Sequence, residues 1–170
     1  MGNTYSIIEL IQDGRVDLDS RDNKGRTPLS YAAEGENTYS IIELIQDGRV
    51  DLDSRDNKGR TPLSYAAERG NTYSIIELIQ DGRVDLDSRD NEGRTPLSYA
   101  IIYRWIEAVA LLLRTGKVNI DCTDRHGLSP MDYAGRLNYR DMNSTDGPIL
   151  NLAHPELEAA NLIIPAIKKM

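Results

Sequence analysis

Acidic side chains recur in sets along the sequence and are the first candidates for chemistry. Each set has the spacing D-x-D-x-x-D, and the sets occur at Asp17, Asp19 and Asp22, at Asp51, Asp53 and Asp56, and at Asp85, Asp87 and Asp90. A calcium loop needs the spacing D-x-D-x-[DN]-G and a distant bidentate Glu, which the segment DLDSRDNKG does not supply. Basic residues such as Arg55 and Lys58 are interleaved with the acids. The pattern therefore predicts a solvated or ion-paired edge and no metal site.

Other residues that could do chemistry are few and scattered. His126 and His154 have no zinc-ligand companion in the sequence, and no G-x-S-x-G motif appears. Cys122 is the only cysteine, and we interpret it as a small buried apolar residue. No nucleophile, base and orienting group can be assembled, so we expect neither an enzyme nor a cofactor. A single cysteine cannot form an internal disulfide, which favours a reducing, cytoplasmic compartment.

The charge pattern excludes two classes of partner. The net charge is −7, and basic and acidic residues alternate without a basic stripe that could neutralise phosphates. No apolar run approaches the length that spans a bilayer. We therefore expect no nucleic-acid partner and no membrane partner.

The elements that position these residues come from an internal repeat. Residues 37–70 read NTYSIIELIQDGRVDLDSRDNKGRTPLSYAAERG, and near-copies occupy residues 3–36 and 71–104. A looser fourth copy fills residues 105–138, and the prolines at 28, 62, 96 and 130 keep a constant spacing of 34. Self-similarity at such a period predicts a solenoid in which each unit buries its apolar face against its neighbours.

Each unit contains signals for two helices and an extended loop. In the second copy the apolar residues of NTYSIIELIQ gather on one helical face, and Gly48 suits the left-handed position after a helix. Val50 and Leu52 then alternate with acids, which predicts a hairpin-like excursion. Thr61 and Pro62 have the residue types that open a helix. The fold class predicted is all-α.

These residues resemble a known family. GRTPLSYAAERG is similar to the ankyrin-repeat signature of a turn, Thr-Pro-Leu, small residues and a helix-ending glycine. The 34-residue unit, against the common 33, resembles the repeats of fungal multidomain ankyrin proteins, although the sequence contains no nucleotide-binding domain. The resemblance implies stacked helix-turn-helix units with hairpin loops, and a non-enzymatic scaffold that binds a protein through its concave face of inner helices and hairpins.

Carried over by position, the resemblance names the residues of that face. In the second copy they are Asn57, Lys58, Arg60, Glu68 and Arg69; in the third Asn91, Glu92, Arg94, Ile102 and Tyr103; and in the fourth Arg125, His126 and Leu128. These charges could equally serve only to keep the face soluble, so each position is a hypothesis.

The third copy replaces AAERGN by AIIYRW at residues 100–105. Large apolar groups in a packed stack need something that accommodates their volume. The fourth repeat and a C-terminal helix could cover them, or Tyr103 and Trp105 could form a hydrophobic hot spot for a partner. Both interpretations stay open from the sequence.

The two ends of the array suggest a second function. The first copy begins at the second helix of a unit, and residues 139–170 depart from the repeat, with a capping helix expected near residues 155–167. If that tail does not cap the array, one end could complete the other. The alternative function is therefore a structural protein that self-assembles head to tail into homo-oligomers.

Overall fold

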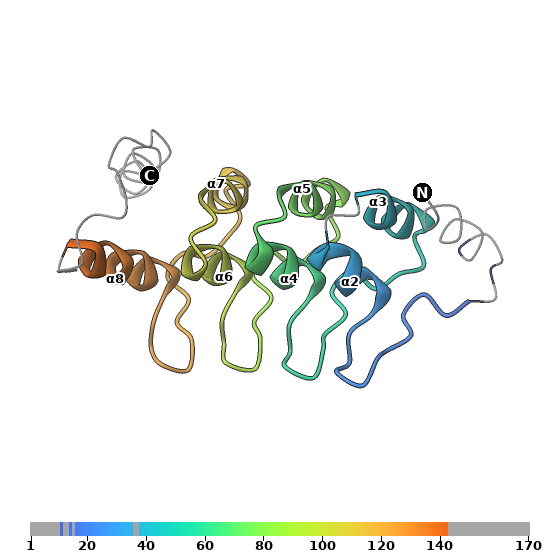
Figure 1. The fold of residues 1–170 in the computed structure, drawn as a ribbon, viewed down its shortest axis with the longest axis horizontal. Coiled ribbons are helices and arrows are strands. Elements are labelled where there is room, and N and C mark those ends of the chain that lie inside the picture. Colours follow the sequence, from blue (N-terminus) through green and yellow to red (C-terminus); the bar gives the residue numbers. More distant parts are fainter. Residues whose placement is uncertain (1–10, 12–13, 15, 36–37, 143–170) are drawn as a thin grey trace.

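The helices form two parallel rows in the computed structural model of the protein, which describes residues 11, 14, 16–35 and 38–142 (Figure 1). The inner row consists of α2 (Pro28–Glu34), α4 (Pro62–Arg69), α6 (Pro96–Ile102) and α8 (Pro130–Met142). The outer row consists of α3 (Thr38–Asp47), α5 (Thr72–Asp81) and α7 (Ile106–Arg114). The all-α repeat fold is thus confirmed. The array boundary at residue 138 stays a prediction, and the helix expected near residues 155–167 lies outside the described residues.

The inner helices α2, α4 and α6 begin with the same hydroxyl cap. The Thr61 hydroxyl accepts a hydrogen bond from the Ser64 amide at 3.3 Å, and the Ser64 hydroxyl accepts one from the Thr61 amide at 3.3 Å. Pro62 fits the first turn because that position needs no N–H donor. Gly70 ends α4 in the left-handed region, at φ +68°. The helix starts predicted from Thr-Pro-Leu are therefore where the sequence places them.

The core lies between the two helix rows and continues from one unit to the next. Leu63 and Ala67 of α4 are completely buried, as are Ile75 and Leu78 of α5. The alanines let α4 approach both α2 and α6 closely. Every unit therefore buries its apolar side chains against its neighbours, and no single centre exists.

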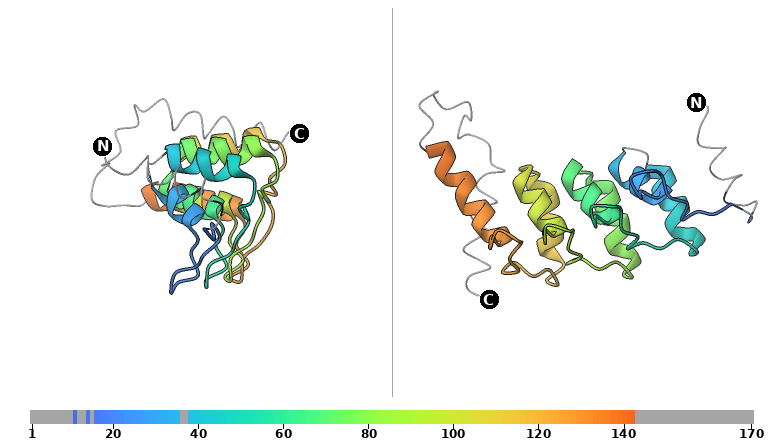
Figure 2. Two further views of the ribbon diagram at one scale, coloured as in Figure 1. Left: turned by 90° about the vertical axis from the view of Figure 1, so that its right-hand side faces the viewer. Right: turned by 90° about the horizontal axis from the view of Figure 1, so that it is seen from below.

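Long loops join each outer helix to the next inner helix, and all project to the same side of the inner row (Figures 1 and 2). No residue of the described ranges has strand pairing, in agreement with the expected extended excursion. Val50 and Leu52 at the start of one loop are each only 4% exposed, so the base of the loop belongs to the core. None of the helices that the structure describes has the length and apolarity needed to cross a membrane.

Candidate protein-binding face

The loop tips form one row because each tip is hydrogen-bonded to the tip of the preceding unit. The Asn57 amide donates to the Lys24 carbonyl at 2.9 Å, and the Asn91 amide donates to the Lys58 carbonyl at 2.8 Å. The Arg125 amide continues the row with a 2.8 Å bond to the Glu92 carbonyl. The tips are thus fixed in position before any partner arrives, which lowers the entropy cost of binding.

Side chains of the predicted site divide into two groups along this row. Asn57 and Asn91 donate their side-chain amides to the preceding tip, at 3.1 and 3.0 Å, and so support the row itself. Lys58 is exposed, and Glu92 lies 3.9 Å from Arg125 and 4.0 Å from His126 across neighbouring tips. Asn57, Lys58, Asn91, Arg125 and His126 are all exposed, so a partner can reach both groups.

The recurring aspartates stabilise the loops through backbone donors. The Asp53 carboxylate accepts from the Asp85 amide of the next unit at 3.0 Å, and Asp87 accepts in the same way from the Asn119 amide at 2.9 Å. The Arg55 guanidinium donates to the Arg89 carbonyl of the next loop. The aspartates thus use backbone N–H groups as well as cations, and the described residues contain no group of three or more potential ligands that could hold a metal ion.

A polar cluster lies where each loop meets its inner helix. In the second unit Asp56 accepts from the backbone amides of Lys58 and Arg60 at 2.8 Å and from the Tyr65 hydroxyl at 2.7 Å. The Arg60 guanidinium lies over the Tyr65 ring at 4.3 Å and donates to Glu68 at 3.0 Å. The side chain of Arg60, a predicted binding residue, is therefore only 16% exposed.

Hydrogen bonds decide the ionisation of this cluster. Burial alone would raise the pKa of Asp56, but hydrogen bonds from Tyr65 and the Arg60 backbone, with the Arg60 charge, hold it below its ordinary value. Burial and the bond to Asp56 raise the pKa of Tyr65. Asp56 is thus an anion and Tyr65 a neutral donor at neutral pH.

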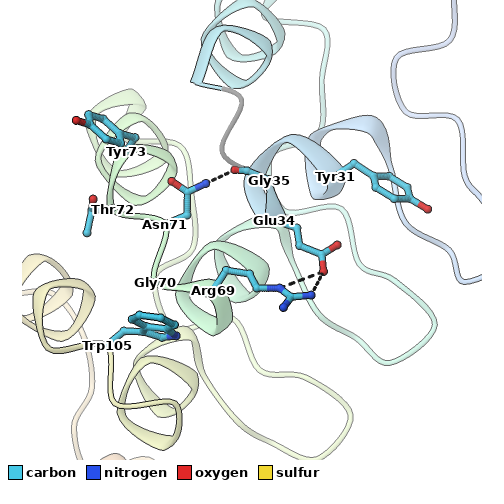
Figure 3. Close-up of a pocket in the computed structure, with 9 residues that line it drawn as sticks. All are labelled: Tyr31, Glu34, Gly35, Arg69, Gly70, Asn71, Thr72, Tyr73 and Trp105. Carbon is cyan, nitrogen blue, oxygen red and sulfur yellow. Dashed lines mark hydrogen bonds and ion pairs between the residues drawn. The ribbon is translucent and has the colours of Figure 1, made fainter.

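The ends of the inner helices away from the loops border an open groove of about 820 Å³ (Figure 3). Arg69 bridges to Glu34 of the preceding unit at 2.6 Å, and the Tyr103 hydroxyl donates to Glu68 in the corresponding way at 3.1 Å. Trp105 lies over Gly70 and donates its indole N–H to the Glu68 carbonyl at 2.9 Å. The groove therefore lies where the inner helices turn back into the outer helices of successive units.

The large apolar groups at residues 101–105 have two environments. Ile101 is 9% exposed and belongs to the core, whereas Tyr103 and Trp105 remain 50% and 45% exposed. Ile102 is partly exposed. Gly70 at the end of α4 thus accommodates Trp105, a contact that the sequence interpretation did not include. The hot-spot interpretation stays a prediction.

Comparison with known families agrees with this geometry. The model described as ankyrin repeats, in three copies, matches residues 1–90 and 66–144. The chain belongs to the ankyrin-repeat family. A comparison with curated proteins finds no match to it. Ankyrin repeats are in general protein–protein interaction modules, which is the function class expected from the sequence.

Two roles within this ankyrin array were missed by sequence reasoning. Cys122 takes the position of Ser88, a hydroxyl that bonds Thr61 at 3.0 Å, and its thiol donates to the Asn119 carbonyl at 3.3 Å. Burial raises the pKa of the Cys122 thiol. Trp105 takes the position of Asn71, whose side chain donates to the Ala33 carbonyl of α2 at 3.3 Å. A comparison of positions 34 residues apart in the sequence could have found both.

Proposed function

We propose that this ankyrin array is a non-enzymatic scaffold that binds a protein partner through the loop tips and the inner helices. One observation carries the proposal: the tips are hydrogen-bonded to one another through their backbones, while exposed charged side chains such as Lys58 and Arg125 project from them. A row that is already ordered presents its side chains at little conformational cost.

A capture experiment with matched variants tests this proposal. Lys58→Glu replaces a positive by a negative charge on the tip row, and Gln80→Glu places a negative charge at an exposed position of α5. We expect a partner from cell extract to be lost with the tip variant and retained with the outer-helix variant. A partner that is lost only with Gln80→Glu contradicts the proposal.

Self-assembly is a second candidate, supported by the exposure of one tyrosine. Tyr31 of α2 is 47% exposed, whereas Tyr65 and Tyr99, which have an inner helix on both sides, are 2% and 5% exposed. A second copy could cover Tyr31 in a head-to-tail contact. Light scattering over a concentration series tests this: a mass that rises with concentration supports assembly, and a constant monomer mass contradicts it.

A further inference from the structure

The inner face carries the same arginine in three successive units, and its partners differ in the third. Arg26 lies 3.6 Å from Glu34, and Arg60 lies 3.0 Å from Glu68. At the corresponding position the third unit has Ile102, so Arg94 has no carboxylate from its own helix. The first two units thus show how a carboxylate sits on this arginine, and the third unit lacks it.

Without the glutamate, part of the Arg94 guanidinium has no hydrogen-bond partner among the described residues. Its Nε donates to Asp90 at 3.3 Å, and within the described residues its two terminal amines have no hydrogen-bond partner. In contrast, the terminal amines of Arg60 donate to Glu68 at 3.0 Å and to the Tyr65 hydroxyl at 2.6 Å. The Arg94 side chain is 33% exposed, against 16% for Arg60.

Arg94 is nevertheless held in place. Its backbone amide donates to Asp90 at 2.8 Å, and its guanidinium lies 5.3 Å from the centre of the Tyr99 ring. The corresponding distance for Arg60 is 4.3 Å, so the arginine without a glutamate lies farther from its tyrosine. A positioned guanidinium whose two terminal amines donate to none of the described residues is suited to bind one carboxylate in a bidentate manner.

We propose that Arg94 binds a carboxylate of an acidic peptide segment in the place that Glu34 and Glu68 fill in the first two units, with an apolar side chain of that segment against Ile102. This inference rests on the proposed function and names the partner's chemistry at one point of the face.

The surroundings favour a peptide over a nucleic acid. Ile102 and the half-exposed Tyr103 offer apolar contacts beside the guanidinium. The aspartates along the loops and the net charge of −7 would repel a continuous polyanion. A short segment with one or two acids next to apolar residues avoids most of that repulsion.

Selection from a phage-displayed library of random linear peptides on the full chain tests the inference. We expect the selected peptides to contain Asp or Glu next to an apolar residue, and a labelled peptide to lose at least about tenfold in affinity when that acid is replaced by its amide. A selection that returns no acidic peptide contradicts the inference.

Two substitutions at one position identify the site. Ile102→Glu restores the internal carboxylate and should weaken the peptide at least about tenfold, while Ile102→Gln, similar in size but uncharged, should weaken it less than about threefold. Thermal unfolding of both variants checks that the fold is kept. Equal losses in the two variants contradict the carboxylate assignment.

The variants also separate this inference from the proposed function. Peptides that bind Ile102→Glu as well as the parent chain, but are lost with Lys58→Glu, contradict the role of Arg94 and leave the proposed face in place. Peptides that bind all variants equally contradict both proposals.

Discussion

Asp56 is a carboxylate that lies almost out of contact with solvent and is still ionised. It is 7% exposed, and it receives hydrogen bonds from two backbone amides and from Tyr65. Such a group stabilises the loop only as long as its oxygens keep these hydrogen-bond donors. The same cluster recurs in the other units around Asp22, Asp90 and Asp124.

Asp56→Asn should lower the free energy of unfolding by about 1.5–3 kcal/mol, because it removes the charge that Arg60 and Tyr65 contact. Asp51→Asn is the matched control, since Asp51 is exposed, and its effect should stay within about 0.5 kcal/mol. Urea unfolding measures both variants. Equal effects would contradict the importance of the buried cluster.

Acid should destabilise the array through the same carboxylates. Despite burial, hydrogen bonds lower the pKa of Asp56 and Asp124 below the ordinary value of 3.8. Each carboxylate has a lower pKa in the folded chain than in the unfolded chain. Between these two values the unfolded chain binds more protons, so the free energy of unfolding should decrease as pH falls below about 4. Urea unfolding at several pH values measures the decrease, which should be smaller for Asp56→Asn; an unchanged slope would count against the assignment.

At the scale of the element, the loop tip depends on a glycine for two reasons. Gly59 has φ +78°, and a Cβ atom there would lie 2.9 Å from the Asn91 backbone nitrogen of the next tip. Gly82 has a similar φ of +81° but open space around it. A substitution at Gly82 therefore tests backbone strain alone, whereas one at Gly59 tests backbone strain together with contact between units.

Gly82→Ala should cost about 1–2 kcal/mol, from the left-handed backbone alone. Gly59→Ala should cost a further 1–3 kcal/mol, approximately, because the next tip must move away. Chemical denaturation gives both values. Similar costs for the two substitutions would mean that the tips are not in close contact.

The helix reversal provides a second test of contact between units. Trp105→Ala removes the indole donor to the Glu68 carbonyl and the contact with Gly70, and should cost about 1–3 kcal/mol. Trp105→Asn restores the residue of the other copies, whose amide can donate to the preceding unit, and should cost less. Thermal melting ranks the two, and a greater loss for the Asn variant would contradict this role.

The helices were predictable from the sequence, because Thr61, Pro62 and Gly70 act locally at helix ends. The contacts between units were not, since a bond such as Asn57 to Lys24 depends on how loops 34 residues apart lie in space. For the same reason Arg60 was predicted as a binding residue although its neighbours largely occupy it. Only the comparison of equivalent positions revealed the different environment of Arg94.

At the scale of the whole molecule, stability comes from the interfaces between successive units. Each inner helix packs on the next, and each loop is bonded to the next, so a change in one unit is felt mainly by its neighbours. This arrangement lets one unit lose an internal ion pair, as at Arg94, while the stack is preserved.

Hydrogen exchange of the chain with a selected peptide bound tests the proposed binding face most directly. We predict protection at the loop tips and along α6, around Asn91, Arg94 and Ile102. The outer helices α5 and α7 should exchange as in the free protein. Protection confined to the outer helices, with the tips and the inner row unchanged, would contradict the account.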